Sequence, residues 1–200
     1  MAEDLSKKQK VSAAIVAACI VCAPVTASFE GFVPKVRPDP VGIPTGCFGE
    51  RADLPGSDLD PSRIYTRTEC AARLRDKLAK AYAPKIAACL PQITAADRRN
   101  EFAAMIDASY NGGPGAVCTS TMARDIKVDQ WEAARQAYKS FRVGSVTAHP
   151  VRGAMSVRRI VRGPNRGKYF NTFRGLVNRR ATFANIWATP EGPAPAEGAH

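Results

Sequence analysis

Four prolines and four glycines between residues 31 and 49 exclude an α-helix from this part of the chain. Proline breaks the hydrogen bonding of a helix and glycine permits tight turns, so the stretch predicts a short β-hairpin. Residues 63–65 are the only other part that resembles a strand. The remainder has apolar residues at helical spacing. This pattern predicts an α+β fold, mostly helical, in which a small β-hairpin lobe faces a helical lobe across a cleft.

Three helices are predicted after the hairpin. Residues 68–90 repeat large apolar side chains at helical intervals, and these are Leu74, Leu78, Tyr82 and Ile86. Helix starts are predicted near 94–97 and 129–132, where Thr94 and Asp129 each precede an acid by three residues. With 200 residues, 45% of them hydrophobic, and no internal repeat, the chain is long enough to form the core of one domain.

Two carboxyl groups and one hydroxyl are the candidate catalytic groups around the hairpin. Glu30 ends an apolar run, where burial favours the protonated carboxylic acid. Asp39 lies between Pro38 and Pro40, which keep the backbone extended, and Thr45 follows six positions later. Glycoside hydrolysis needs one protonated carboxyl group and one ionised carboxylate, so this set predicts a glycosidase site.

The same segment contains three short motifs in a fixed order. They are Glu30-Gly31, Asp39-Pro40-Val41-Gly42 and Thr45-Gly46-Cys47-Phe48-Gly49. This order resembles the phage-type lysozymes, the muramidase endolysins of glycoside hydrolase family 24. Later blocks extend the resemblance over residues 29–187, and these are Tyr65-Thr66 with Glu69-Cys70, residues 109–113 with Ser120-Thr121, and residues 175–180 with Ile186-Trp187.

The resemblance implies an endolysin that lyses the host cell by hydrolysing the β-1,4 bond between N-acetylmuramic acid and N-acetylglucosamine. Glu30 is then the general acid, Asp39 steers or deprotonates the attacking water, and Thr45 positions that water. The resemblance also implies inversion at the anomeric carbon. It implies no metal ion and no organic cofactor. The expected partner is peptidoglycan, bound by a monomer.

Two further residues are expected to support this site. By resemblance, Arg179 reaches Glu30 and adjusts its ionisation, and Asn111 belongs to the central block. Two positions depart from the family pattern, because Glu50 stands where a histidine is common and Phe183 where an acid is usual. Neither belongs to the expected catalytic set, so the predicted reaction is unchanged.

The amino-terminal segment has the pattern of an export signal. Lys7, Lys8 and Lys10 precede an uncharged, alanine-rich run from Val11 to Phe29. We interpret it as an uncleaved signal-arrest-release segment. It takes the enzyme to the bacterial periplasm, tethers it transiently to the inner membrane through residues 11–28, and then packs onto the domain. The alternatives are a buried core helix and a signal peptide cleaved after Ala27, which would remove the helix that carries Glu30.

Six cysteines in an exported chain predict disulfides. Spacing and resemblance favour pairing Cys47 with Cys70 and Cys89 with Cys118, which leaves Cys19 and Cys22 as thiols. Two roles stay open for these thiols: a redox switch that rearranges the disulfide beside Thr45, or small apolar residues. No spacing of cysteines with His149 and His200 is typical of a zinc site.

Charge is the remaining signal. The net charge is +11, and twelve Lys or Arg but no Asp or Glu lie between Glu132 and Glu191. This excess predicts an anionic partner such as peptidoglycan, anionic lipid or lipopolysaccharide; a solvated basic face is the alternative. Nucleic-acid binding is a second hypothesis, and the export segment argues against it. It rests on basic residues with aromatic residues nearby, which are Arg152, Arg158, Arg159, Arg162, Arg166, Lys168 and Arg174 with Tyr169, Phe170 and Phe173. A catalytically inactive, peptidoglycan-binding structural protein is a third.

The predicted organisation therefore has three parts. Residues 1–28 form the signal-arrest-release or signal segment, residues 29–187 the lysozyme domain, and residues 188–200 a disordered tail rich in Pro, Ala and Gly. Residues 143–174 form a basic insertion within the domain, for which a surface loop is the simplest interpretation.

Overall fold

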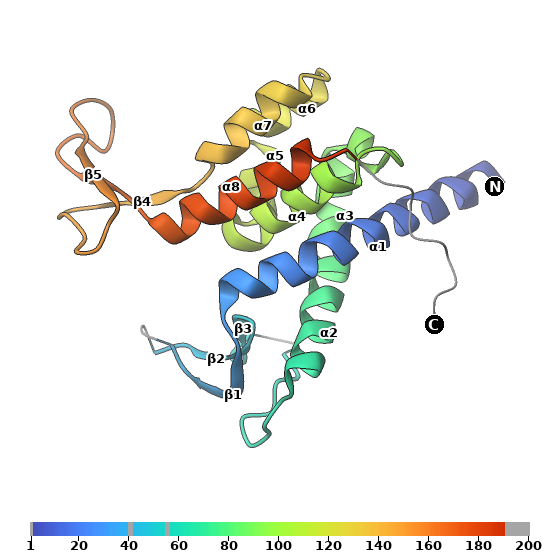
Figure 1. Cartoon of the computed structure of the whole chain (residues 1–200), viewed down its shortest axis with the longest axis horizontal. Coiled ribbons are helices and arrows are strands. Elements are labelled where there is room, and N and C mark those ends of the chain that lie inside the picture. Colours follow the sequence, from blue (N-terminus) through green and yellow to red (C-terminus); the bar gives the residue numbers. More distant parts are fainter. Residues whose placement is uncertain (1, 40–41, 55–56, 191–200) are drawn as a thin grey trace.

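The structure is a computed structural model, and it describes residues 2–39, 42–54 and 57–190. Pro40 and Val41 of the Asp39-Pro40-Val41-Gly42 motif lie outside the described residues, as do residues 191–200 of the predicted tail. Figure 1 shows a helical lobe, a small β-lobe beneath it and a second sheet at the end opposite the amino terminus. The prediction of a mostly helical α+β fold with a small β-lobe is confirmed.

The amino-terminal helix α1 (Ala2–Glu30) packs against α4 (Arg99–Gly112), the central helix of the large lobe. Its contact face is made of small residues, since Ala18, Cys19, Cys22 and Thr26 are all buried. The helix ends before Gly31, whose φ of +71° is a conformation that glycine adopts readily and that often follows a helix. The last residue of the helix is Glu30.

The β-lobe follows directly. It consists of β1 (Val33–Pro38), β2 (Pro44–Cys47) and β3 (Glu50–Arg51) in an antiparallel sheet of order β1-β2-β3. Lys35 also forms a bridge with Ile64, so both strand predictions are confirmed. A disulfide between Cys47 and Cys70 joins this sheet to the next helix.

That helix is continuous but changes its winding. It runs through α2 (Arg67–Lys77), a π-helical turn η1 (Leu78–Tyr82) and α3 (Ala83–Cys89). Thr66 caps its start, accepting a hydrogen bond from the Glu69 amide, while the Glu69 carboxylate accepts one from the Thr66 amide. Pro84 cannot donate a backbone hydrogen bond to the preceding turn, and the π turn lies directly before it.

The other helices complete the large lobe. They are η2 (Pro91–Thr94), α5 (Pro114–Cys118), α6 (Thr121–Lys127), α7 (Trp131–Ser140) and α8 (Arg174–Ala188). A second disulfide joins Cys89 to Cys118. Cys19 and Cys22 are unpaired and buried.

Two predicted helix starts are wrong. Thr94 belongs to η2 and its hydroxyl donates to the Pro91 carbonyl, so α4 starts five residues later at Arg99. Asp129 has a φ of +57°, and α7 starts at Trp131 without a side-chain cap. In both places the polar residue predicted to cap the helix lies instead in a short turn before the helix begins.

The prediction that only the hairpin and residues 63–65 are strand-like is also wrong, because residues 143–174 contain a second sheet. This segment, the basic wing, contains a sheet of order β4-β6-β5, formed by β4 (Gly144–Thr147), β5 (Ser156–Arg159) and β6 (Tyr169–Thr172). All four residues of β5 are exposed, so no apolar alternation marks it as a strand. Apolar periodicity in the sequence therefore does not predict this sheet.

Candidate active site

A cleft of about 260 Å³ lies where the end of α1, the β-lobe, α2 and α4 meet. It contains one carboxylate of the expected catalytic set, Glu30, together with Asn111. The remaining wall is formed by Gly49, Arg51, Leu54, Lys77, Tyr82 and Tyr110. The cleft thus has a carboxylate, two cations and two aromatic rings, which are groups suited to a polar, ring-shaped ligand such as a sugar.

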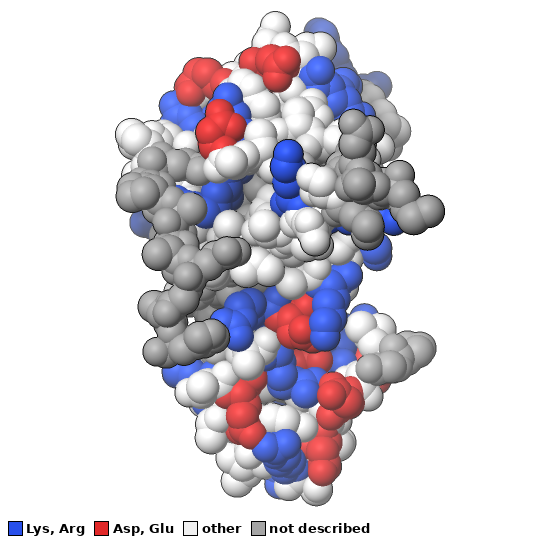
Figure 2. Space-filling view, turned by 90° about the vertical axis from the view of Figure 1, so that its right-hand side faces the viewer, with Lys and Arg blue, Asp and Glu red and all other residues white. Residues whose placement is uncertain are grey.

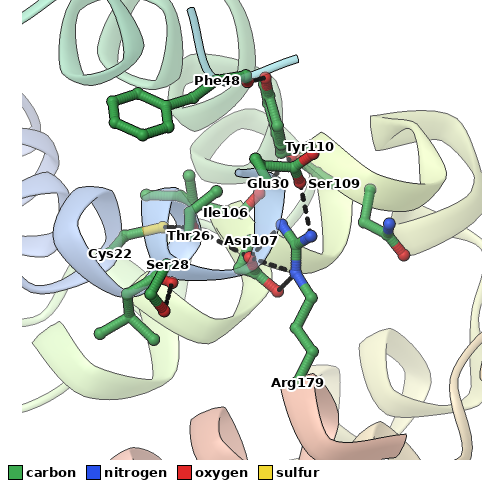
Figure 3. A network of polar contacts seen from close by, with 12 residues as sticks. Cys22, Thr26, Ser28, Glu30, Phe48, Ile106, Asp107, Ser109, Tyr110 and Arg179 are labelled. Atoms are coloured by element: carbon green, nitrogen blue, oxygen red, sulfur yellow. Dashed lines mark hydrogen bonds and ion pairs between the residues drawn. The ribbon is translucent and has the colours of Figure 1, made fainter. Parts of the chain in front are cut away.

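Glu30 is held by an ion pair on one side and lies close to a glycine on the other. The Arg179 Nη1 donates to Glu30 Oε1 at 2.5 Å, as the resemblance implied, and the Glu30 side chain keeps 21% of its surface exposed (Figure 3). On the other side lies Gly49, where an added Cβ would stand 3.1 Å from Glu30 Oε2. The carboxyl group therefore has a fixed position with one face open to the cleft.

Arg179 is itself fixed by Asp107, a fully buried carboxylate of α4. Its Nε lies 2.9 Å from Asp107 Oδ1 and 3.1 Å from Oδ2, and its Nη2 lies 2.7 Å from Oδ1. The Thr26 hydroxyl of α1 donates to the same Oδ1 at 2.9 Å (Figure 3). Side chains from α1, α4 and α8 thus meet behind Glu30.

Arg180 forms the second branch of this network. Its Nη1 donates to Asp107 Oδ2 at 2.9 Å and its Nη2 to Asn111 Oδ1 at 2.7 Å. Its Nε donates to the Phe141 carbonyl at 2.9 Å. Asn111 therefore touches the cleft and is oriented by a fully buried arginine.

The charges of this cluster decide its ionisation. Burial alone lowers the pKa of Arg179, but hydrogen bonds and the charges of Asp107 and Glu30 outweigh burial and raise that pKa above its usual value. Arg179 is thus a permanent cation beside Glu30. Two buried arginines share the single carboxylate of Asp107, so these three side chains together carry an excess of positive charge behind Glu30.

Two tyrosines line the cleft next to Glu30. Burial, and then the Glu30 charge, raise the pKa values of Tyr110 and Tyr82, so both stay neutral. The Tyr110 hydroxyl donates to the Phe48 carbonyl at 2.8 Å and so joins α4 to the β-lobe (Figure 3). The two rings meet edge to face, with centroids 5.2 Å apart.

The other two expected catalytic residues lie in the β-lobe, Asp39 directly after β1 and Thr45 within β2. Asp39 Oδ1 accepts a hydrogen bond from the Ile43 amide at 2.9 Å, and the Thr45 hydroxyl donates to the Ile43 carbonyl at 3.1 Å. Both residues are half-buried. Thr45 pairs across the sheet with Arg51, a residue of the cleft wall. The structure therefore brings Glu30, Arg179 and Asn111 together. Asp39 and Thr45 lie in the β-lobe and are not among the residues that line this cleft.

Sequence reasoning missed Asp107 and the two tyrosines as parts of the site, and it preferred Arg179 to the neighbouring Arg180 as the arginine that acts there. Asp107 left one detectable signal, because it is a lone acid within the apolar run from Phe102 to Ala108. Such a residue is rarely buried without a cationic partner. Within the described residues, no group of three or more His, Cys, Asp or Glu side chains is arranged to hold a metal ion.

The contact between Gly49 and Glu30 gives a sharp prediction. In Gly49→Ala the new methyl group pushes the Glu30 carboxyl group aside by a few tenths of an ångström. We expect kcat for murein hydrolysis to fall by up to about tenfold, because misplacing a reacting group by a full 1 Å costs on the order of 10²-fold. The matched control is Gly153→Ala. Gly153 has a φ of +84°, close to the +75° of Gly49, and nothing lies within 4 Å of its added Cβ. Equal activities of the two variants would contradict the fixed position of Glu30.

Comparison with known proteins supports the same picture. Residues 27–182 match the family model described as phage lysozyme. The chain is 32% identical over 136 residues to a SAR-endolysin of Bacteriophage PS119, which covers 63% of this chain and 75% of that protein.

Solved structures share the fold. The muramidase domain of SpmX from Asticaccaulis excentricus has a TM-score of 0.61 at 17% identity, covering 85% of this chain and 96% of that one. An endolysin from Escherichia coli O157:H7 phage FAHEc1 has a TM-score of 0.61 at 20% identity, covering 85% and 93%. The active form of the P1 phage endolysin Lyz has a TM-score of 0.56 at 16% identity, covering 82% and 80%.

Proposed function

Because the chain belongs to the phage lysozyme family and is a peptidoglycan-hydrolysing endolysin of the muramidase type, we propose that it cleaves murein by the inverting mechanism, as in glycoside hydrolase family 24. The bond attacked is the β-1,4 bond between N-acetylmuramic acid and N-acetylglucosamine. The observation that carries the proposal is the position of Glu30, half-enclosed in the cleft and bound to Arg179 at 2.5 Å.

In this mechanism Glu30 gives its proton to the glycosidic oxygen as the bond to the sugar breaks. The carboxylate that results is stabilised by Arg179, whose position is fixed by Asp107. Asp39 then steers or deprotonates a water molecule that attacks the opposite face of the sugar, and the Thr45 hydroxyl orients that water. Asp39 acts from the turn after β1 and Thr45 from strand β2, both in the β-lobe. The aromatic wall of Tyr82 and Tyr110 offers a surface for the sugar rings.

Analysis of the products tests this mechanism. Purified Gram-negative murein is digested, and the new reducing ends are identified chemically. We expect N-acetylmuramic acid at these ends and, in NMR spectra of the earliest product, the α-anomer. Reducing ends of N-acetylglucosamine would refute the muramidase assignment, and a first-formed β-anomer would refute inversion. No release of sugar would favour a structural, peptidoglycan-binding protein.

A second part of the proposal concerns localisation. The protein is exported to the periplasm and first tethered to the inner membrane through residues 11–28. Residues Lys8–Glu30 are long and apolar enough to cross a bilayer. The similarity to a SAR-endolysin supports the same route. Val16 and Ile20 are 58% and 50% exposed when α1 is packed on the domain, so this helix keeps apolar side chains on its outer face.

A substitution on that outer face tests the tether. Ala13 is exposed, so Ala13→Leu makes the segment more hydrophobic without disturbing its packing. We expect a larger share of this variant in the carbonate-resistant membrane pellet, and later lysis. The control is Ala133→Leu on an exposed position of α7. If both variants fractionate like the unchanged protein, the segment is not the tether.

The thiols Cys19 and Cys22 form the third part. We propose that, once α1 leaves the membrane, one of them exchanges with the Cys47–Cys70 disulfide beside the catalytic turn. Both thiols are buried in α1, and α1 packs against α2, the helix that carries Cys70. Replacing both by serine is expected to delay lysis. Unchanged timing of export, release and lysis would leave them as packing residues only.

A further inference from the structure

The basic wing exposes many basic side chains and no acidic one. Its seven basic side chains are all exposed, and they are Arg152, Arg158, Arg159, Arg162, Arg166, Lys168 and Arg174. No acid lies between Glu132 and Glu191, and no ion pair joins any of the seven to a carboxylate of the described chain. These charges do not serve the stability of the fold, since surface charges without partners repel one another.

Exposed aliphatic side chains lie among these charges. Val146, Met155, Val157 and Val161 are 41%, 46%, 44% and 71% exposed. They make up four of the nine large hydrophobic residues that the described chain leaves exposed. Through the strand register, Val146 and Arg158 flank Phe170 on one face of the sheet. The aromatic rings of the wing, in contrast, are half-buried.

The wing is a rigid support rather than a loose loop. Buried Asn171 donates to the Thr147 hydroxyl at 2.7 Å and accepts from the Val151 amide at 2.8 Å, which fixes the β4–β5 connection. At the far end, Ile160 and Lys168 continue the ladder, with the Ile160 amide 2.8 Å from the Lys168 carbonyl. The backbone that carries the basic and aliphatic side chains is therefore ordered before binding, so only the side chains have to be ordered on a ligand.

The charge is concentrated at one end of the molecule. The wing projects from the body at the end opposite the amino terminus (Figure 1). Figure 2 views the side at the other end, where acidic and basic side chains are interspersed. The molecule therefore has a directional attraction to an anionic surface, with the wing foremost.

We propose that the basic wing is a membrane-binding site that takes the phosphate groups of anionic phospholipids. Guanidinium groups bind phosphate oxygens in a fork, and aliphatic side chains between them enter the boundary of the acyl chains. A single-stranded nucleic acid needs exposed aromatic faces for base stacking, which this wing does not present. The site is separate from the cleft and adds a lipid contact to the peptidoglycan substrate.

Vesicle binding by the full chain tests the inference. The probe is a set of large unilamellar vesicles of phosphatidylcholine with 0 or about 30% phosphatidylglycerol. The test variant is Arg158→Gln/Arg162→Gln/Arg166→Gln. The matched control removes three exposed basic side chains of the helical lobe, Lys85→Gln/Arg124→Gln/Lys127→Gln. All proteins keep α1, so its contribution to binding cancels. Melting curves and murein hydrolysis verify that each variant is folded.

Each basic side chain at an anionic membrane contributes about fivefold to binding, so we expect the test variant to bind vesicles containing phosphatidylglycerol on the order of 100-fold more weakly. The control variant is expected to lose much less, and raising the salt concentration is expected to remove the difference. Equal losses in the two variants would overturn the inference in favour of non-specific charge. Binding to a single-stranded oligonucleotide that is tighter than binding to the vesicles would overturn it in favour of nucleic acid.

In a further variant, Val157→Ser/Val161→Ser, we expect weaker binding at unchanged charge. Unchanged binding of this variant would refute the contact with the acyl boundary.

Discussion

Replacing Glu30 by glutamine is expected to lower kcat for murein hydrolysis about 10³-fold, which is the scale of a lost general acid. The amide retains the shape of the side chain and still accepts a hydrogen bond from Arg179, so the cleft stays intact. It has no proton of suitable acidity for the glycosidic oxygen. Release of reducing sugar from purified murein, followed at saturating substrate, measures the effect.

The control for this variant is Glu132→Gln. Glu132 lies on α7 with 65% of its side chain exposed, and it is bound to Arg135 far from the cleft residues. We expect its activity to equal that of the unchanged protein. A Glu30→Gln enzyme that retains more than about a tenth of its kcat would assign the acid to another group.

Replacing Asp107 by asparagine is expected to lower the free energy of unfolding by about 3–5 kcal/mol, the scale of breaking a buried ion pair from one side. After this change Arg180 is buried without a carboxylate partner, and Arg179 keeps only Glu30. The asparagine also turns a nitrogen toward groups that donate. For a chain of this length the melting temperature is expected to fall by about 10 °C or more.

Asp129→Asn is the matched control for this loss. Asp129 is exposed and has a φ of +57°, a conformation that asparagine tolerates well. Its free energy of unfolding is expected to change by less than about 0.5 kcal/mol. Denaturant titrations followed by circular dichroism give both values. If Asp107→Asn proved as stable as Asp129→Asn, the buried network would not be the anchor of the three helices.

The sequence predicted the parts of the fold that have a local cause. Proline and glycine define the β-lobe, and apolar spacing defines the helix after it. It did not predict the π turn at Leu78–Tyr82. Tyr82 was interpreted as an ordinary core position because helical spacing assumes regular winding. The turn instead places the ring of Tyr82 at the cleft wall beside Glu30.

The buried network and the basic wing escaped prediction for different reasons. The partners of Asp107 are Thr26, Tyr138, Arg179 and Arg180, and they come from three other helices that only the tertiary fold brings together. The wing has one strand, β5, in which every side chain is exposed, and its buried residue is the polar Asn171. Hydrophobic periodicity carries no information about such a sheet.

The shared use of α1 limits how this protein can be engineered. The helix contributes Thr26 to the Asp107 network and ends in Glu30, so it is part of the site as well as the leading segment of the chain. A recombinant fragment begun at residue 29 would carry the acid on a free end, and a bulky tag joined close to the helix would stand beside its packed face. Fusions are better placed at the carboxyl end. Replacing apolar residues of α1 by polar ones to raise solubility is expected to harm the enzyme, because the same helix packs on the domain and carries Glu30.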